Sequence, residues 1–219
     1  MGEAGFLRAR RPEQKAERRR AILAAAATVL DREGLEGVSL AAIAAEAGVV
    51  KSGLYRYFES REEILLRLLL ADMDDLCIAF DAKVGAGDLT VPETAAIMAG
   101  GFIARPRLCL LISEMAATLE RNVSGETLRD VKREIVDGSH RATATLARAL
   151  PALGPERSGE AVLMLYVLVA GLWPMTQPSP ELSALLDEPE FAPVRKDFTA
   201  TLQGAALAML TGLSTTTAR

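Results

Sequence analysis

Hydrophobic side chains recur every three or four residues along most of the 219-residue chain, which is the spacing of one face of an α-helix. The first such stretch begins at Pro12, a residue that suits the first turn of a helix, and has apolar positions between Ile22 and Leu30. Gly34 suits its C-terminal cap. The pattern therefore predicts a helix over residues 12–34, preceded by an irregular basic arm over residues 1–11.

Two short helices and a long one are expected next. Ser39 is a good N-cap for a helix that Gly48 closes. After a tight turn, another short helix covers about residues 51–58. A long helix then begins at Ser60 and reaches roughly Asp81, because Ser60 and the glutamate three residues later have the spacing of a capping box.

Beyond a break at residues 85–88, the remaining periodic segments are also helical. The expected helices cover residues 92–104, 106–121, 124–150, 155–172 and 193–213, and one further short helix follows the loop at residues 178–180. No segment of the sequence alternates convincingly between polar and apolar residues, as a strand would. The sequence thus predicts an all-α fold.

Composition agrees with this class, and the distribution of charge suggests a division. Alanine and leucine are abundant and aromatic residues make up only 5% of the chain, which favours helices over strands. Up to Arg61 there are 11 basic and 8 acidic residues, whereas the remainder has 14 and 21, for a net charge of −4. A mildly basic front and an acidic rear indicate two modules with different partners, although a solvated face explains a few arginines equally well.

Cysteine usage and hydropathy bear on the compartment. Cys77 and Cys109 lie in apolar helical patterns, which favours two buried thiols in a reducing compartment over a disulfide. The basic N-terminal segment also contains acids, so we expect the apolar run AILAAAATVL behind it to be a helix of the fold and not part of a secretory signal. The apolar run Ala161–Trp173 is too short to cross a bilayer and suits a buried or dimer-forming helix. We therefore expect a cytoplasmic protein without a membrane partner.

The candidate chemistry gathers between Val49 and Leu65, where aromatic and basic residues crowd together. The two short helices joined at Gly48 form a helix-turn-helix, with Ile43 and Leu54 meeting in the angle between them. The second helix of such a unit can enter the DNA major groove and present its N-terminal side chains to base edges. Tyrosine hydroxyls and neighbouring cations can contact phosphates. The aromatics are alternatively core residues, an interpretation that we adopt only for Phe58.

The run GLEGVSLAAIAAEAGVVKSGLYRYFESREEIL resembles the N-terminal DNA-binding domain of the TetR family of transcriptional regulators. Its motif is specific: an Ile-Ala helix, an Ala-Gly-Val turn, Lys, Leu-Tyr, Tyr-Phe and Ser-Arg-Glu-Glu. The similarity covers about residues 19–65, and the rear is similar in helical architecture and more weakly in RPRLCLLISEMAATLERNVS. The resemblance implies a helix-turn-helix domain over residues 1–62 and a helical ligand-binding and dimerisation domain over residues 63–219. It also implies a homodimer, double-stranded operator DNA and a small-molecule inducer of unknown identity.

The resemblance also assigns roles to individual residues. Predicted base contacts are Lys51, Ser52 and Arg56, and predicted phosphate contacts are Ser39, Gly53, Tyr55, Tyr57 and Arg61. Two positions depart from the family pattern. Val50 stands where many members have a serine-like cap, and Gly53 stands where many have a threonine or serine. The operator sequence therefore does not transfer from other members.

A ligand pocket and a subunit interface are expected in the rear half. Methionine and aromatic side chains can line an adaptable apolar pocket, although ordinary core packing explains any one of them. The candidates are Phe80, Met98, Phe102, Met115, His140, Tyr166 and Trp173, and Arg105, Glu114 or His140 could orient a polar ligand group. The last two long helices are more apolar than one chain needs and suit a dimer-forming four-helix bundle. The predicted interface residues are Ala161, Leu165, Ala170, Gly204 and Ala208.

Catalytic and metal sites lack their usual signatures in this sequence. The single histidine has no Cys/His partner at ligand spacing, the glycines at 85 and 87 lack the Lys-Ser/Thr of a phosphate loop, and there is no nucleophile elbow. We expect no enzymatic activity and no cofactor or metal. The expected function is a sequence-specific DNA-binding transcriptional regulator, a repressor released from its operator by a small apolar ligand. The alternative is a helical dimeric interaction protein that has lost specific DNA binding.

Overall fold

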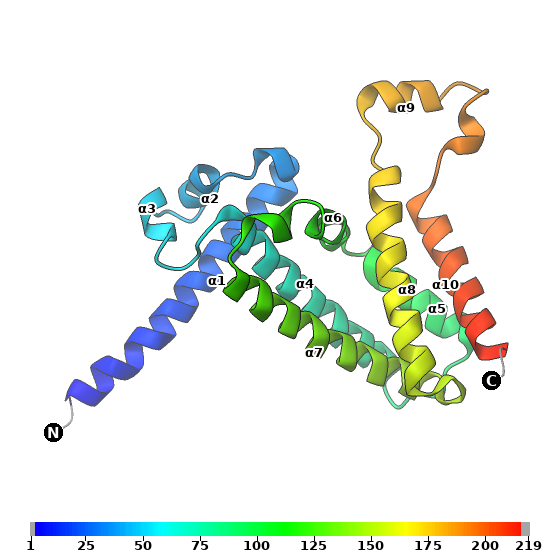
Figure 1. The fold of residues 1–219 in the computed structure, drawn as a ribbon, viewed down its shortest axis with the longest axis horizontal. Helices are drawn as coiled ribbons and strands as arrows, with labels where there is room; N and C mark the ends of the chain where they lie inside the picture. The colour runs from blue at the N-terminus through cyan, green and yellow to red at the C-terminus, as the bar shows by residue number, and fades with distance from the viewer. Residues whose placement is uncertain (1–2, 216–219) are drawn as a thin grey trace. The chain divides into compact units, whose positions relative to one another are not determined.

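The computed structural model describes residues 3–215, and throughout this range the regular structure is helical (Figure 1). The all-α prediction is therefore confirmed for the described residues. The α-helices are α1 (Glu3–Gly37), α2 (Leu40–Glu46), α3 (Lys51–Leu54), α4 (Arg61–Val84), α5 (Val91–Ile103), α6 (Pro106–Met115), α7 (Gly125–Ala149), α8 (Gly154–Met175), α9 (Pro180–Leu186) and α10 (Phe198–Thr215). Short 3-10 turns, η1 (Leu119–Asn122), η2 (Pro151–Leu153) and η3 (Ala192–Val194), lie between them.

The chain divides into two compact units. The first comprises Met1–Leu68 with Thr118–Arg129, and the second comprises Leu69–Ala117 with Asp130–Arg219. The long helices α4 and α7 each pass from one unit into the other. The domain boundary expected between residues 62 and 63 stays a prediction.

The first unit is built around the apolar faces of α1, α2, α3 and the start of α4. Ile22, Ile43, Leu54 and Ile64 are each 0% exposed. Burying one such side chain contributes roughly 1.5–3 kcal/mol to folding. Ile43 and Leu54 are both in this core, as the helix-turn-helix interpretation requires, so α2 and α3 are held by side chains that are unavailable to any ligand.

The start of α1 differs from the prediction. The helix begins at Glu3 and not at Pro12, so the irregular arm expected over residues 1–11 is wrong for residues 3–11; residues 1 and 2 lie outside the described range. Residues 3–11 are mostly Glu, Ala, Leu and Arg, which favour helix. The prediction relied on apolar periodicity, and that signal is weak where helix-forming residues are mainly charged.

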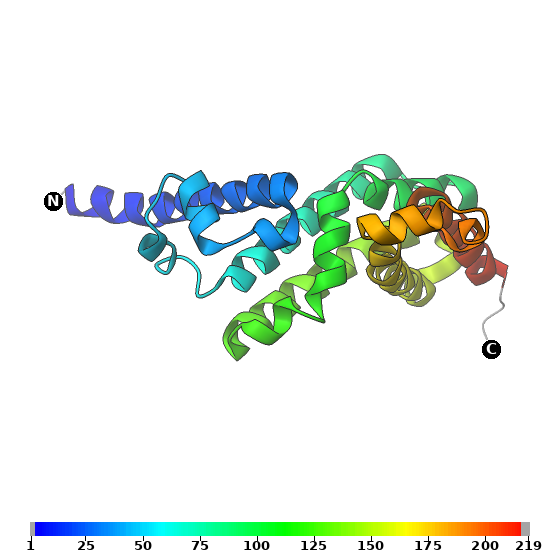
Figure 2. The same cartoon turned by 90° about the horizontal axis from the view of Figure 1, so that it is seen from above.

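The second unit is a helical bundle in which α10 packs against α5 and α8, and α6 packs against α8 (Figures 1 and 2). Two predicted helices end or begin elsewhere. The helix expected over residues 106–121 stops at Met115. The last helix begins at Phe198 and not at residue 193, because Asp197 caps it: the N–H of Ala200 donates to Asp197 Oδ1 at 2.6 Å.

The connection between α8 and α10, residues 176–197, contains α9 and η3 and has no buried residue. Figure 1 shows it beyond the ends of the two helices that it joins. An ion pair between Arg195 and Asp187, at 2.5 Å, closes its turn. Leu182, Leu185 and Val194 are exposed apolar residues of this connection. Its fold is therefore fixed by local contacts and leaves apolar surface uncovered in one protomer.

The length of α8 also differs from the expectation. From the apolar run at residues 161–173 we expected a segment too short to cross a bilayer. The helix α8 has 22 residues, and the stretch Pro151–Met175 is long and apolar enough to cross a membrane. The bent pair α5 and α6, at 81°, passes the same test if it counts as one span. Such a result is weak evidence for a membrane span, because core helices of globular proteins also pass it. Only 28% of the apolar window of α8 is buried, so much of its apolar surface is open in the protomer.

Candidate nucleic-acid interface and ligand cavity

The recognition segment, residues 51–58, presents its polar side chains outward and its large apolar side chains inward. Lys51, Ser52 and Arg56 are exposed, and Tyr55 is 56% exposed. Leu54 is fully buried and Phe58 is nearly so, four residues apart as on one face of a helix. The segment therefore offers cations and hydroxyls to a partner while the core fixes its orientation.

The regular helix within this segment is shorter than predicted. α3 ends at Leu54, although the N–H of Phe58 still donates to the Leu54 carbonyl at 3.0 Å. Val50 occupies the N-cap position and makes no side-chain hydrogen bond there, so the first N–H groups of α3 lack a side-chain partner. Gly53 lowers the helix propensity further. Val50 and Gly53 are the two positions at which the sequence departs from the family pattern.

Helix α2 and the turn after it follow local rules closely. Ser39 is the N-cap of α2, and its Oγ accepts the N–H of Ala42 at 3.1 Å. Ser39 is exposed, and because its oxygen is the acceptor here, its O–H can still donate to a phosphate. Gly48 has a φ of 63°, which a residue with a side chain rarely adopts, and this allows the sharp turn into α3. The predicted cap and turn are confirmed.

Arg19 of α1 fixes the end of the recognition segment. Its guanidinium donates to the Tyr57 carbonyl and lies 4.4 Å from the centre of the Phe58 ring, a cation–π distance. It also lies 3.8 Å from a carboxylate oxygen of Glu63 in α4. Arg19 thus joins three parts of the unit. Sequence reasoning missed this role, although Arg19 precedes buried Ile22 by one helical turn and so lies on the same face of α1.

Arg61 is placed differently from the other predicted phosphate contacts. It is half-buried at the start of α4, and its Nη2 donates to the Leu35 carbonyl at 2.7 Å. Its Nη1 lies 3.6 Å from Glu62. Because the guanidinium binds a carbonyl near the end of α1, Arg61 ties the start of α4 to α1. The predicted phosphate contact of Arg61 stays a prediction, because one hydrogen bond leaves other N–H donors of the guanidinium available.

Two basic residues of α1 lie beside the recognition segment. Lys15 and Arg18 line one groove together with Arg56 and Tyr57. Arg18 also lines an adjoining groove with Gly53. Sequence reasoning did not select them, although their spacing of three places both on one helical face. They place two further basic side chains of α1 beside the recognition segment, in a groove that Glu17 also lines.

The second unit contains an apolar cavity of about 390 Å³, a volume within the range of small-molecule sites. Residues of α4, α5, α6, α7 and α8 line it. Tyr166 reaches across it, with its hydroxyl 3.4 Å from the Met115 sulfur. An apolar cavity between five helices is the arrangement expected for a small-molecule site in a helical bundle.

Comparison with known proteins agrees with the helix-turn-helix in the first unit and with the helical bundle of the second unit. Residues 22–68 match the model of bacterial regulatory proteins of the tetR family. Residues 68–217 match the model of the tetracyclin repressor-like C-terminal domain. The chain belongs to the TetR family of bacterial transcriptional regulators. It is therefore a DNA-binding transcriptional regulator.

Individual relatives agree with this assignment. The chain is 36% identical over 63 residues to the uncharacterised HTH-type transcriptional regulator YfiR of Bacillus subtilis (strain 168), a match that spans 29% of this chain and 31% of that protein. A transcriptional regulator from Rhodococcus sp. Rha1 has a similar structure, with a TM-score of 0.59 and 21% identity over 91% of this chain and 99% of that one. A TetR/AcrR-family regulator from Thermobifida fusca YX-ER1 also has a similar structure, with a TM-score of 0.55. It is 19% identical, and the match covers 90% of this chain and 98% of that one. At these identities the two structures establish the fold.

The predicted pocket residues of this TetR-family chain divide into two groups. Phe80, Met98, Phe102, Met115 and Tyr166 line the cavity. His140 is exposed and Trp173 packs edge-on against Phe198, with ring centres 5.0 Å apart; neither lines the cavity. Their selection as pocket residues is corrected, because type and approximate position do not reveal which side of a helix faces inward. Arg105, named as a possible polar group, does line the cavity.

The two cysteines are free thiols in different surroundings. Cys109 is fully buried in α6, and burial raises the pKa of its thiol to about 12. Cys77 is half-buried, lines the cavity and also has its pKa raised by burial. The prediction of buried thiols thus holds for Cys109 and only in part for Cys77.

The predicted interface residues also divide. Ala161 and Leu165 are buried within the protomer, so they cannot line a subunit interface, and this part of the prediction is corrected. Ala170 is half-buried, and Gly204 and Ala208 are exposed. The open apolar face of α8 instead comprises Leu163, Met164 and Val167. The small residues suggested that helices of two subunits could approach closely. Which of these residues face outward depends on how each helix is rotated about its axis in the fold.

Among the described residues, no group of three or more His, Cys, Asp or Glu side chains is arranged to hold a metal ion.

Gly53 can be tested by replacement with alanine. A Cβ there would lie 3.7 Å from the nearest atom, a Val50 methyl, which is ordinary contact. Gly53→Ala should therefore raise the free energy of unfolding by about 0.5–1 kcal/mol, measured by urea denaturation. If the bare main chain approaches phosphates, DNA affinity should fall at the same time. Unchanged affinity in the stabilised variant would remove Gly53 from the candidate contacts.

Proposed function

We propose that the protein is a cytoplasmic homodimeric repressor that binds an operator with two half-sites and leaves it when a small molecule enters the cavity. The main support for this proposal is the arrangement of the recognition segment. One side of it exposes cationic and hydroxyl-bearing side chains, and the other side is buried in the core. Such an arrangement is what a helix needs to read bases while remaining fixed in orientation.

Base and phosphate contacts are proposed for different residues of this surface. Lys51, Ser52 and Arg56 are exposed and occupy the predicted base-reading positions. Ser39, Gly53, Tyr55 and Tyr57 are proposed phosphate contacts, to which we add Lys15 and Arg18 because they share a groove with Arg56. Phosphate contacts position the protein, and base contacts give it sequence preference.

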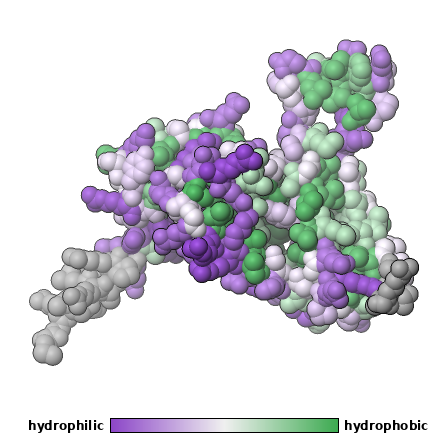
Figure 3. Space-filling view, viewed as in Figure 1, coloured by the Kyte–Doolittle hydropathy of each residue, from purple (hydrophilic) through white to green (hydrophobic). Residues whose placement is uncertain are grey.

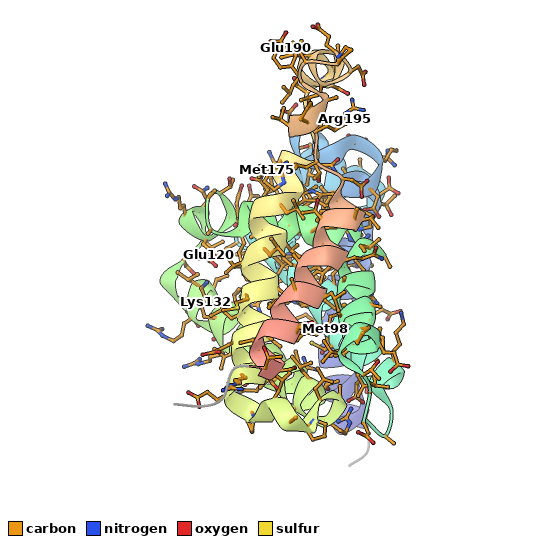
Figure 4. The ribbon with its side chains drawn as sticks, turned by 90° about the vertical axis from the view of Figure 1, so that its right-hand side faces the viewer. Met98, Glu120, Lys132, Met175, Glu190 and Arg195 are labelled. Carbon is orange, nitrogen blue, oxygen red and sulfur yellow. The ribbon has the colours of Figure 1, made fainter. Side chains whose placement is uncertain are left out.

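The dimer is proposed to form through α8 and α10. Figure 3 shows apolar surface along α8 and on the connection between residues 176 and 197. Figure 4 shows α8 and α10 side by side, with Met175 near the end of α8 and Glu190 and Arg195 in the connection beyond it. We propose that Val167, Ala170, Gly204 and Ala208 meet their counterparts in a second copy. Two recognition segments could then enter successive major grooves about 34 Å apart.

Coupling between ligand and DNA is proposed to act through α4 and α7. Both helices line the cavity and both continue into the first unit. Near the recognition segment, the Ser124 N–H donates to Glu59 Oε1 at 2.8 Å, and this hydrogen bond holds the pKa of Glu59 below its usual range. A ligand that favours another placement of these helices would weaken DNA binding, and DNA would weaken ligand binding by the same factor.

The test of DNA reading is selection from random duplex DNA by the purified protein, at two salt concentrations. We expect an inverted repeat to be enriched and binding to weaken as salt rises. Lys51→Ala should alter base preference, costing about 1–3 kcal/mol at one position, whereas Tyr55→Phe should lower affinity for all sequences. Salt-sensitive binding without an enriched sequence would contradict base reading. No binding at all would favour a dimeric interaction protein.

A further inference from the structure

The charged residues that line the cavity are all cations. They are Lys83 of α4, Arg105 at the junction of α5 and α6, and Lys132 of α7. Among the described residues, no aspartate or glutamate lines this space. The chain as a whole has a net charge of −4, so the cationic lining is opposite to the overall charge. The cavity therefore combines an apolar interior with three cationic side chains in its lining.

Arg105 is the least exposed of these cations and is fixed in position. Its Nη1 donates to the Gly101 carbonyl at 3.0 Å and its Nη2 donates to the Asp75 carbonyl at 3.4 Å. Both acceptors are main-chain oxygens, which orient the guanidinium without cancelling its charge. A guanidinium has five N–H donors in a planar fork that fits a carboxylate or phosphate. Arg105 therefore suits the recognition of an acidic group.

The cavity has an apolar inner region and a charged border with solvent. Phe80, Met98 and Phe102 provide apolar surface, while Lys83 and Lys132 are exposed residues at the border with solvent. Figure 4 shows Met98 and Lys132 on either side of α8, on α5 and α7. A molecule with an apolar body could bury that body between the helices and keep an acidic group near the cations.

We infer that the cavity binds an anionic amphiphile, an apolar molecule with one carboxylate or phosphate group. This inference rests on the proposed function and names the class of its ligand. A neutral molecule of the same shape gains only the apolar contacts. A cationic one is repelled mainly by Arg105, the least exposed of the three cations, because like charges repel more strongly where less water screens them.

The test compares ligands with the same twelve-carbon tail and different headgroups. Dodecanoate, dodecyl phosphate, dodecan-1-ol and dodecyltrimethylammonium are titrated into the full-length protein below their micelle-forming concentrations. Binding is measured by calorimetry and by protection of Cys77 from N-ethylmaleimide. We expect at least one of the two anions to bind about 10-fold or more tightly than the alcohol, and the cation to bind most weakly. The comparison of the two anions distinguishes carboxylate from phosphate recognition.

Substitutions of single cations test which side chain causes the preference for an anionic ligand. Arg105→Gln should lower the affinity for the preferred anion about 10-fold and leave the affinity for dodecan-1-ol unchanged. Arg105→Lys should restore part of the loss. Arg133→Gln is the matched control, because Arg133 is an exposed α7 residue paired with Asp130 that does not line the cavity. Lys83→Gln, at an exposed position, gives the same comparison if Arg105→Gln does not fold.

The outcomes separate this inference from the proposed function. Equal affinity for all four headgroups would overturn the inference and leave a cavity for apolar ligands. No binding of any of them would overturn the inference and leave the proposed DNA reading intact. Anion-selective binding that leaves operator affinity unchanged would support the inference and contradict ligand-induced release.

Discussion

Replacing Val167 with arginine is expected to separate the dimer and lower operator affinity by about 100-fold or more. Val167 is 59% exposed in the middle of α8, within the apolar face proposed to meet a second copy. An arginine there would bring an unpaired charge into the interface from each subunit, at a large desolvation cost. A monomer can hold only one half-site, so the gain from linking two binding events, about 10²–10⁴-fold, would be lost.

Sedimentation and fluorescence anisotropy with the selected duplex would measure these two effects. Val136→Arg is the matched control, because Val136 is also an exposed valine, 50% accessible, but lies on α7. It should remain dimeric and bind DNA normally. A dimeric Val167→Arg variant with full affinity would exclude this face of α8 from the interface. Dissociation caused by Val136→Arg would place the interface elsewhere.

Alkylation of Cys77 with N-ethylmaleimide is expected to lower operator affinity about 5–150-fold, the usual size of coupling between two sites. The added group would occupy part of the cavity that Cys77 lines and would act there as a covalently held ligand. The reaction should be slow and should accelerate as pH rises, because burial raises the pKa of Cys77 and the thiolate is the reactive form. Cys109 should not react, since it is fully buried and its pKa is raised to about 12.

Mass spectrometry would count the modified cysteines, and anisotropy would follow DNA binding by the same samples. The Cys77→Ala variant should bind DNA normally and should not respond to the reagent. If singly modified protein kept full operator affinity, filling this part of the cavity would not be coupled to DNA binding. The proposed release mechanism would then be rejected, while the DNA-binding assignment would stand.

Local sequence signals gave reliable predictions where the physics is local. Ser39 caps α2, Gly48 adopts the left-handed turn, and the Ser60 Oγ accepts the Glu63 N–H at 3.0 Å. Each needs only neighbouring residues. The capping box at Ser60 is nevertheless only half formed, because the Glu63 carboxylate accepts the N–H of Glu59, at 2.7 Å. Even a local motif can exchange a partner when another donor lies closer.

Predictions failed where the answer depends on helix rotation or on a distant partner. The sequence placed Trp173 in the pocket, whereas the structure packs it against Phe198. It did not show that the Arg61 guanidinium binds the Leu35 carbonyl, 26 residues away in the chain. Arg19 was missed because its partners come from the recognition segment and from α4. Neither residue type nor spacing along the chain identifies such partners.

The sequence by itself determined that this protein is all-α, where most helices begin, and that a helix-turn-helix lies near its start. These properties follow from helical periodicity, caps and turn residues, which act over a few positions. The tertiary structure decided which residues face the solvent, the core or the cavity, and that the charged residues in the cavity lining are cations. That choice depends on how α4 to α8 pack, because a helix with apolar residues on several sides can bury more than one of its faces.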